Sequence, residues 1–123
     1  MSRIKITAGE VTAFAKLNDS STAKHILDAL PLTGNGARWG QEIYFSIPVK
    51  IRDVKHSVSV VEKGDLAYWP PGSAFCIFWG PTPASHGDEI RAASAVSVFG
   101  RLEGDPTVFE SVGSSVEVLV ERA

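Results

Sequence analysis

Two polar side chains on one predicted strand are well placed to do chemistry. Residues 42–47 alternate polar Glu42 and Tyr44 with apolar Ile43 and Phe45, and period-two alternation is typical of a strand with one buried face. Glu42 and Tyr44 therefore lie on the face opposite Ile43 and Phe45. If that face lines a groove, a carboxylate and a phenol can hold a ligand by hydrogen bonds. The alternative is an exposed outer face that binds nothing.

Aromatic side chains are concentrated between residues 64 and 82. This stretch holds two of the three tryptophans and the one cysteine of the chain. Its pattern predicts strands at 66–69 and 74–79, joined by a Pro-Pro-Gly turn. Tyr68, Trp69 and Trp79 could form an aromatic floor for a peptide or a ring-shaped ligand. Packing in the core and at its rim is the favoured alternative.

Other polar groups carry weaker chemical signals. His86, Asp88 and Glu89 are side chains of the types that bind metals, but their spacing matches no standard ligand motif. Asp53 and His56 combine a carboxylate with an imidazole, yet no nucleophile motif accompanies them. We therefore predict neither a metal nor a cofactor.

Bulk composition limits the classes of partner. The chain has 123 residues and a formal net charge of −2, and we expect a single domain over residues 1–123. Without a basic run, the sequence does not predict nucleic-acid binding. The longest apolar run, residues 74–79, is too short to span a bilayer. Charged residues recur through the first twenty positions, so we expect no signal peptide and a cytoplasmic location.

Strands dominate the predicted elements that position these groups. Alternation predicts strands at 3–8, 11–17, 42–47, 92–102 and 116–120, and one more around Val58 and Val60. Residues 31–40 contain three glycines and predict a loop, which lacks the lysine of a phosphate-binding loop.

Two helices complete the prediction. Ala23, Ile26, Leu27 and Leu30 recur at helical spacing after a cluster of capping residues at 18–21, so the main helix ends before the proline that follows. Asp105 is expected to cap a short second helix through residues 107–110. Short, evenly spaced strands with one embedded helix predict a mainly β fold, a small closed β-barrel.

Taken in order, these segments resemble the cyclophilins. Residues 22–30 resemble the first helix of that family, Thr-Ala-x-Asn-Phe-x-x-Leu, and residues 72–77 are similar to its Gly-Ser-Gln-Phe-Phe-Ile strand. Residues 98–104 and 108–112 resemble its Val-Phe-Gly strand and the short helix that follows. The chain looks most like the compact cyclophilin-like proteins of bacteria and archaea, which implies a small barrel and no assigned activity.

The catalytic residues of prolyl isomerases do not carry over with this resemblance. The strand at 42–47 contains no arginine, while Ala74 replaces a glutamine and Cys76 replaces a pocket phenylalanine. Arg38 or Arg52 is left as a substitute for the missing arginine.

Two functional hypotheses follow. The first is a binding module that holds a peptide or small molecule in the groove, with Glu42, Tyr44, Trp69, Phe75 and Arg38 as candidate contacts. The second is a weak or divergent peptidyl-prolyl cis-trans isomerase. A homodimer through an exposed edge strand is a further expectation.

Overall fold

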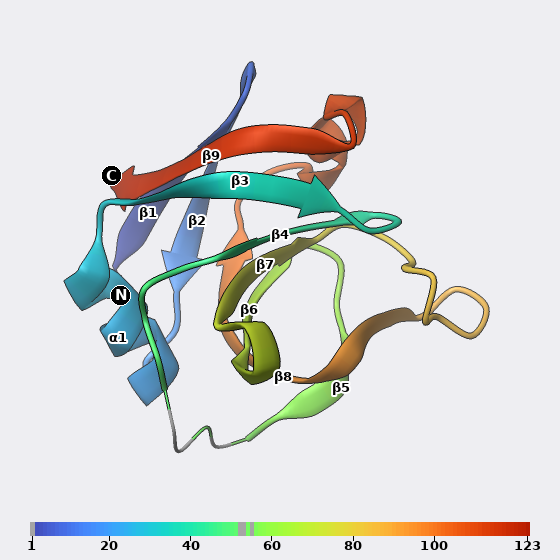
Figure 1. The fold of residues 1–123 in the computed structure, drawn as a ribbon, viewed down its shortest axis with the longest axis horizontal. Helices are drawn as coiled ribbons and strands as arrows, with labels where there is room; N and C mark the ends of the chain where they lie inside the picture. The colour runs from blue at the N-terminus through green and yellow to red at the C-terminus, as the bar shows by residue number, and fades with distance from the viewer. Residues whose placement is uncertain (1, 52–53, 55) are drawn as a thin grey trace.

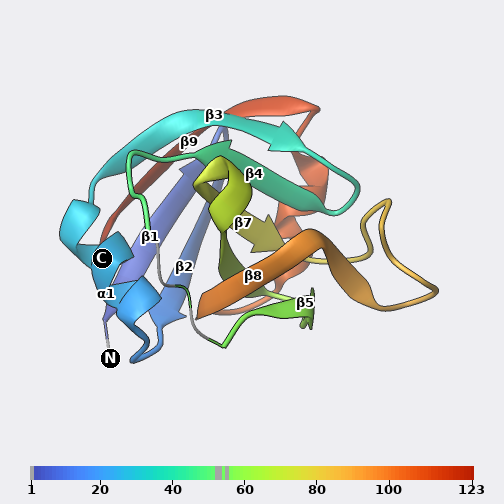
Figure 2. The same cartoon turned by 60° about the horizontal axis from the view of Figure 1, so that its bottom comes forward.

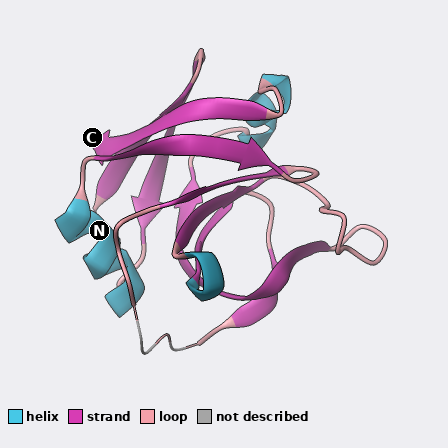
Figure 3. Ribbon diagram, in the orientation of Figure 1, coloured by secondary structure: helices cyan, strands magenta, loops and turns pink. Residues whose placement is uncertain are grey.

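The computed structural model describes residues 2–51, 54 and 56–123, and strands are its main regular structure (Figures 1 and 3). In these residues nine strands, one α-helix and two 3-10 helices occur in the order β1 (Arg3–Ala8), β2 (Val11–Leu17), α1 (Ser21–Ala29), β3 (Leu32–Arg38), β4 (Glu42–Ser46), β5 (Val58–Val61), β6 (Asp65–Trp69), η1 (Pro70–Gly72), β7 (Ala74–Phe78), β8 (Ile90–Leu102), η2 (Pro106–Ser111) and β9 (Ser115–Arg122). The predicted mainly β fold is confirmed, with α1 as its main helix.

The strands are linked into a ring of antiparallel pairs. Their order is β2-β1-β9-β3-β4-β7-β6-β8-β5, and β2 also pairs with β8. That pairing sets Ala15 opposite Leu102 and Leu17 opposite Gly100, so it joins two strands from distant parts of the order. Figures 1 and 2 place α1 beside the ends of β1, β2 and β3.

Alternate residues of β7 belong to two separate apolar clusters. Phe75 and Ile77 belong to the main core, where the Phe75 ring lies 5.2 Å from that of Phe45 and 5.0 Å from that of Phe99, centroid to centroid. Cys76 and its neighbours at 74 and 78 join a smaller cluster with β6 and β8. Both faces of β7 are buried, which explains its uninterrupted apolar sequence.

The two predicted helices, α1 and η2, begin where the capping residues predict. The Ser20 hydroxyl accepts a hydrogen bond from the Ala23 amide at 3.1 Å, and Asp105 accepts one from the Thr107 amide at 3.0 Å. His25 lies on the exposed side of α1. No helix among the described residues is both long and apolar enough to cross a bilayer.

The glycine-rich stretch predicted as a loop is the strand β3. It pairs with β9 from Leu32, opposite Val120, to Ala37, opposite Ser115. A Cβ atom added at Gly34 would lie 2.8 Å from Cδ2 of Phe45, so glycine leaves room for that core ring. Here glycine serves close packing rather than a turn. The other predicted strands that have given bounds differ from the observed ones by at most two residues.

Candidate functional site

A cavity lies on the face of β4, β6 and β7 that is opposite the main core, and residues from the first half of β8 also line it. Its volume is about 110 Å³. The lining side chains are mostly aromatic or small and apolar, with one carboxyl group among them: Trp39, Glu42, Tyr44, Trp69, Cys76, Ala92, Ala93 and Val96. A concave apolar site with few polar groups is the usual form of a small-molecule site.

Strand register brings the floor of this cavity together. Tyr44 is opposite Cys76 in the β4–β7 ladder, and Ala67 is opposite Cys76 in the β6–β7 ladder. Glu42 precedes Tyr44 by two residues and so shares its face. Glu42, Tyr44 and Trp69, three of the predicted contacts, therefore line one cavity.

A bulge in β8 supplies the opposite wall. Val58 pairs with Val96 and Val60 pairs with Arg91, so β8 advances five positions while β5 advances two. Residues 92–95 leave the ladder in this interval, and Ala92 and Ala93 face the cavity. β-Bulges often lie next to functional sites because they redirect side chains.

Glu42 is a buried carboxyl group without a full set of partners. Glu42 is only 5% exposed, and its Oε1 atom has no hydrogen-bond partner in the described residues. Burial raises the pKa of Glu42 to about 7, although the neighbouring Cys76 thiol lowers it in part. The carboxyl group therefore changes charge near neutral pH, which suits it to hold a ligand or exchange a proton.

Burial disfavours the reactive form of Cys76. It is 2% exposed, and burial, with the adjacent Glu42 carboxyl, raises the pKa of its thiol well above the ordinary value. The thiolate is the reactive form of cysteine. Cys76 thus contributes apolar surface and a weak donor.

Two tryptophans are held in place at the sides of the cavity. The Trp69 indole Nε1 donates to Ser94 Oγ at 2.7 Å, and the backbone of Gly72 lies so close that a Cβ atom there would be 2.8 Å from Cζ3 of the ring. Trp39 lies on the turn between β3 and β4, where its amide donates to the Glu42 carbonyl at 2.9 Å. Tyr44, at 37% exposed, is open to solvent.

The structure places the predicted contacts Phe75 and Arg38 away from this cavity. Phe75 is fully buried in the main core, because β7 turns it to the face opposite Cys76. Arg38 contacts η2: Nη1 donates to the Val112 carbonyl at 2.8 Å, and Nη2 pairs with Glu110 Oε1 at 2.7 Å. Arg52, the other predicted substitute, lies outside the described residues.

The remaining aromatic candidates pack in the core. Tyr68 is 1% exposed and Trp79 is 2% exposed. The Tyr68 hydroxyl donates to the Val49 carbonyl at 2.7 Å, and the Trp79 indole donates to Glu110 Oε2 at 2.6 Å. Only Trp69 of the proposed aromatic floor lines the cavity.

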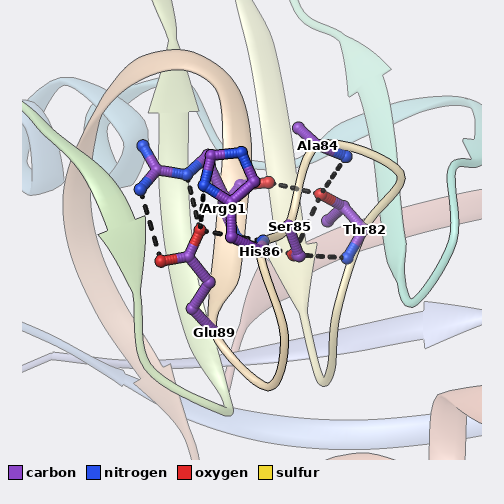
Figure 4. A network of polar contacts seen from close by, with 6 residues as sticks. All are labelled: Thr82, Ala84, Ser85, His86, Glu89 and Arg91. Carbon is purple, nitrogen blue, oxygen red and sulfur yellow. Dashed lines mark hydrogen bonds and ion pairs between the residues drawn. The ribbon is translucent and has the colours of Figure 1, made fainter.

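Polar residues of the loop between β7 and β8, among them His86 and Glu89, form hydrogen bonds with one another and with the start of β8 (Figure 4). Glu89 accepts from the His86 amide at 3.0 Å and pairs with Arg91 Nε at 2.6 Å, and Ser85 Oγ accepts from the Thr82 amide at 2.9 Å. No group of three metal-binding side chains is found in the described residues. Asp53, for which no site with His56 is predicted, lies outside them.

Sequence reasoning did not assign a site role to Trp39, Cys76, Ala92, Ala93 or Val96. The alternation of β7 was a usable signal for Cys76, since it sets that residue on the face of Ala74 rather than of Phe75. No local signal marks the β8 residues, because their position depends on the bulge.

Comparison with known proteins gives a family and a structural relative. The profile of the cyclophilin-like family matches residues 2–121. The solution structure of the hypothetical protein AF2241 from Archaeoglobus fulgidus is similar at a TM-score of 0.84 and 39% sequence identity, over 99% of this chain and 95% of that chain. No curated protein matches the sequence.

Proposed function

This chain belongs to the cyclophilin-like family, and we propose that it binds a small ligand in the cavity between β4 and β8, on the outer face of a closed barrel. Glu42 is the polar anchor of this site, and Trp39, Tyr44 and Trp69 form its apolar walls. The observation that carries the proposal is the buried Glu42 Oε1 atom, which has no hydrogen-bond partner in the described residues.

An unpartnered buried carboxyl oxygen is costly to the folded protein. Burying a polar atom without a hydrogen bond costs roughly 1–3 kcal/mol, and more when the group is charged. Such a cost is commonly found where structure serves binding or catalysis rather than stability. A ligand that donates a hydrogen bond to Oε1 would offset it.

Cavity size limits the part of the ligand that enters. An apolar cavity of about 150 Å³ holds benzene, and this cavity measures about 110 Å³. It therefore suits one small ring or one side chain rather than a folded surface. A longer ligand or a peptide would insert one group and leave the rest on the surface near Tyr44.

Fragment binding to the isotope-labelled protein tests the proposal. Trp39 and Trp69 line the cavity whereas Trp79 is buried beside Glu110, so the indole N–H signal of Trp79 is an internal control in nuclear magnetic resonance spectra. Small ring compounds are expected to shift the Trp39 and Trp69 signals and leave Trp79 unchanged. If no ring compound at millimolar concentration shifts either signal, the binding proposal is wrong.

A weak or divergent prolyl isomerase is the alternative function. One observation favours it: the cavity sets an apolar wall beside Glu42, whose carboxyl group is partly protonated at neutral pH because its pKa is about 7 and can then donate a hydrogen bond to a prolyl amide. Against it, none of the described residues lining the cavity is an arginine. A coupled assay on short Xaa-Pro peptides separates the two functions, since binding alone predicts isomerisation at the buffer rate.

A further inference from the structure

We infer that the group held in this cavity is the protonated nitrogen of a primary or secondary amine attached to a small apolar body. The inference rests on the proposed function, because it names the ligand class of the same site. Three features of the cavity support it: the free carboxyl oxygen, the absence of a cation among the described lining residues and the aromatic walls.

When the Glu42 carboxyl group is ionised, its free oxygen lacks a hydrogen-bond donor. Glu42 Oε1 is buried and accepts no hydrogen bond from the described residues. An ammonium group donates N–H bonds, and bonds between two charged groups are about twice as strong as neutral ones. A quaternary ammonium group has no N–H, so it would leave Oε1 unsatisfied.

Within the described residues the cavity has no positive charge of its own. The titratable side chains that line it are Glu42 and Tyr44 of β4 and Cys76 of β7; β6, β8 and the β3–β4 turn contribute none. No lysine, arginine or histidine is therefore present to neutralise the Glu42 carboxylate. An incoming cation would stabilise the ionised form and lower the pKa that burial has raised.

Aromatic walls also favour a cation. Trp39, Tyr44 and Trp69 come from three separate segments and line the same small space. The faces of aromatic rings attract ammonium groups, tryptophan most strongly. Aliphatic walls would provide the same apolar surface without this preference for positive charge.

A series of compounds of one shape tests the inference on the unmodified protein. Benzylamine, benzyl alcohol, benzoate and trimethylbenzylammonium are titrated at pH 8, with the Trp39 and Trp69 indole signals as the readout. Benzylamine is expected to bind at least about tenfold more tightly than benzyl alcohol, as a charge-assisted bond requires. Benzoate is expected not to bind, and trimethylbenzylammonium to bind more weakly than benzylamine.

The outcomes separate this inference from the proposed function. Equal affinities for benzylamine and benzyl alcohol would overturn the amine inference and leave ligand binding intact, whereas no binding by any compound would overturn both. A trimethylbenzylammonium affinity equal to that of benzylamine would overturn the requirement for an N–H donor. A lysine tripeptide, titrated in parallel, distinguishes a peptide side chain from a free amine as the source of the ligand nitrogen. An affinity for the tripeptide above that for benzylamine would indicate a peptide ligand.

A matched pair of variants checks the anchor. Glu42→Gln keeps the shape of the side chain and removes its charge, so the preference for benzylamine over benzyl alcohol should disappear. Glu117→Gln makes the same change on the exposed surface of β9 and should leave the preference unchanged. A preference that survives in Glu42→Gln would contradict the role of this carboxylate.

Discussion

Burial of the Glu42 carboxyl group couples the charge of the cavity to the stability of the protein. Its pKa rises from the ordinary value of 4.5 to about 7 on folding. Between these two pH values the folded protein holds this proton more tightly than the unfolded chain. The free energy of unfolding therefore contains a contribution that falls as pH rises through this range and stays constant above it.

Glu42→Gln should remove this dependence. At pH 4 and below, the variant and the natural protein should be similarly stable, because the Glu42 carboxyl group is mostly protonated in both the folded and the unfolded chain. By pH 8 the variant should be more stable by roughly 3 kcal/mol. Urea unfolding from pH 4 to pH 8.5 measures the difference, with Glu117→Gln as the control. A difference that does not grow with pH would show that the Glu42 carboxyl group ionises normally.

Arg38 is expected to matter for stability and not for the cavity. Its guanidinium donates to the Glu110 carbonyl at 3.0 Å and to the Val112 carbonyl at 2.8 Å. Arg38→Ala leaves these groups without that donor and should lower the free energy of unfolding by roughly 1–3 kcal/mol. Benzylamine affinity should stay within about twofold of the natural value.

Arg3→Ala is the matched control for that substitution. Arg3 pairs with Glu103 at the surface, where ion pairs contribute little, so a smaller loss is expected in thermal unfolding. A large loss of benzylamine affinity in Arg38→Ala, but not in Arg3→Ala, would show that Arg38 contributes to ligand binding.

At the scale of elements, alternation predicted most strands and also one wall of the cavity. The pattern around Glu42 and Tyr44 fixes which residues share a face, whatever the neighbouring strand. The same rule separates Phe75 from Trp69: Tyr68 is opposite Phe75 in the β6–β7 ladder, so Trp69 lies on the other face. The aromatic type of Phe75 suits a ligand contact, but this register sets its ring in the main core.

The β3 strand and the β8 wall of the cavity depend on long-range packing that the local sequence does not encode. β3 has the glycine content of a loop, and its strand conformation follows from its pairing with β9 and from the space that Phe45 requires. The β8 wall depends on a bulge opposite β5. Neither feature has a periodic signal in the sequence.

Gly34→Ala should destabilise the protein through the core. The added Cβ would lie 2.8 Å from Cδ2 of Phe45, whose ring stacks on Phe75, so the rings must move. Overpacking of this kind costs roughly 1–3 kcal/mol. Asn35→Ala, at the next and exposed position of β3, is the control and should change stability little. Equal stability of both variants in chemical unfolding would show that Phe45 adapts freely.

At the scale of the whole molecule, β5 is the edge through which a homodimer is expected. Among the described strands β5 pairs with β8 alone, and its Val58 and Val60 are 42% and 43% exposed. Exposed apolar edge strands favour pairing with a second copy. Light scattering after gel filtration should give a dimer mass, which Val60→Lys should reduce to that of a monomer.

Val108→Lys is the control for this test, because Val108 of η2 is equally exposed at 43% but lies in no strand. The dimer should survive this change. A monomer mass for the natural protein at high concentration would remove the dimer proposal.

The strand β8 both lines the cavity and pairs with other strands of the ring. β8 pairs with β5 through Val96, with β6 through Ser97 and with β2 through Leu102, while Ala92, Ala93 and Val96 line the cavity. An occupant pressed against the first half of β8 therefore restrains the same strand that joins β2 at its far end. Slower exchange of the β2 and β8 amide hydrogens with heavy water would then report a filled cavity from the opposite end of the strand.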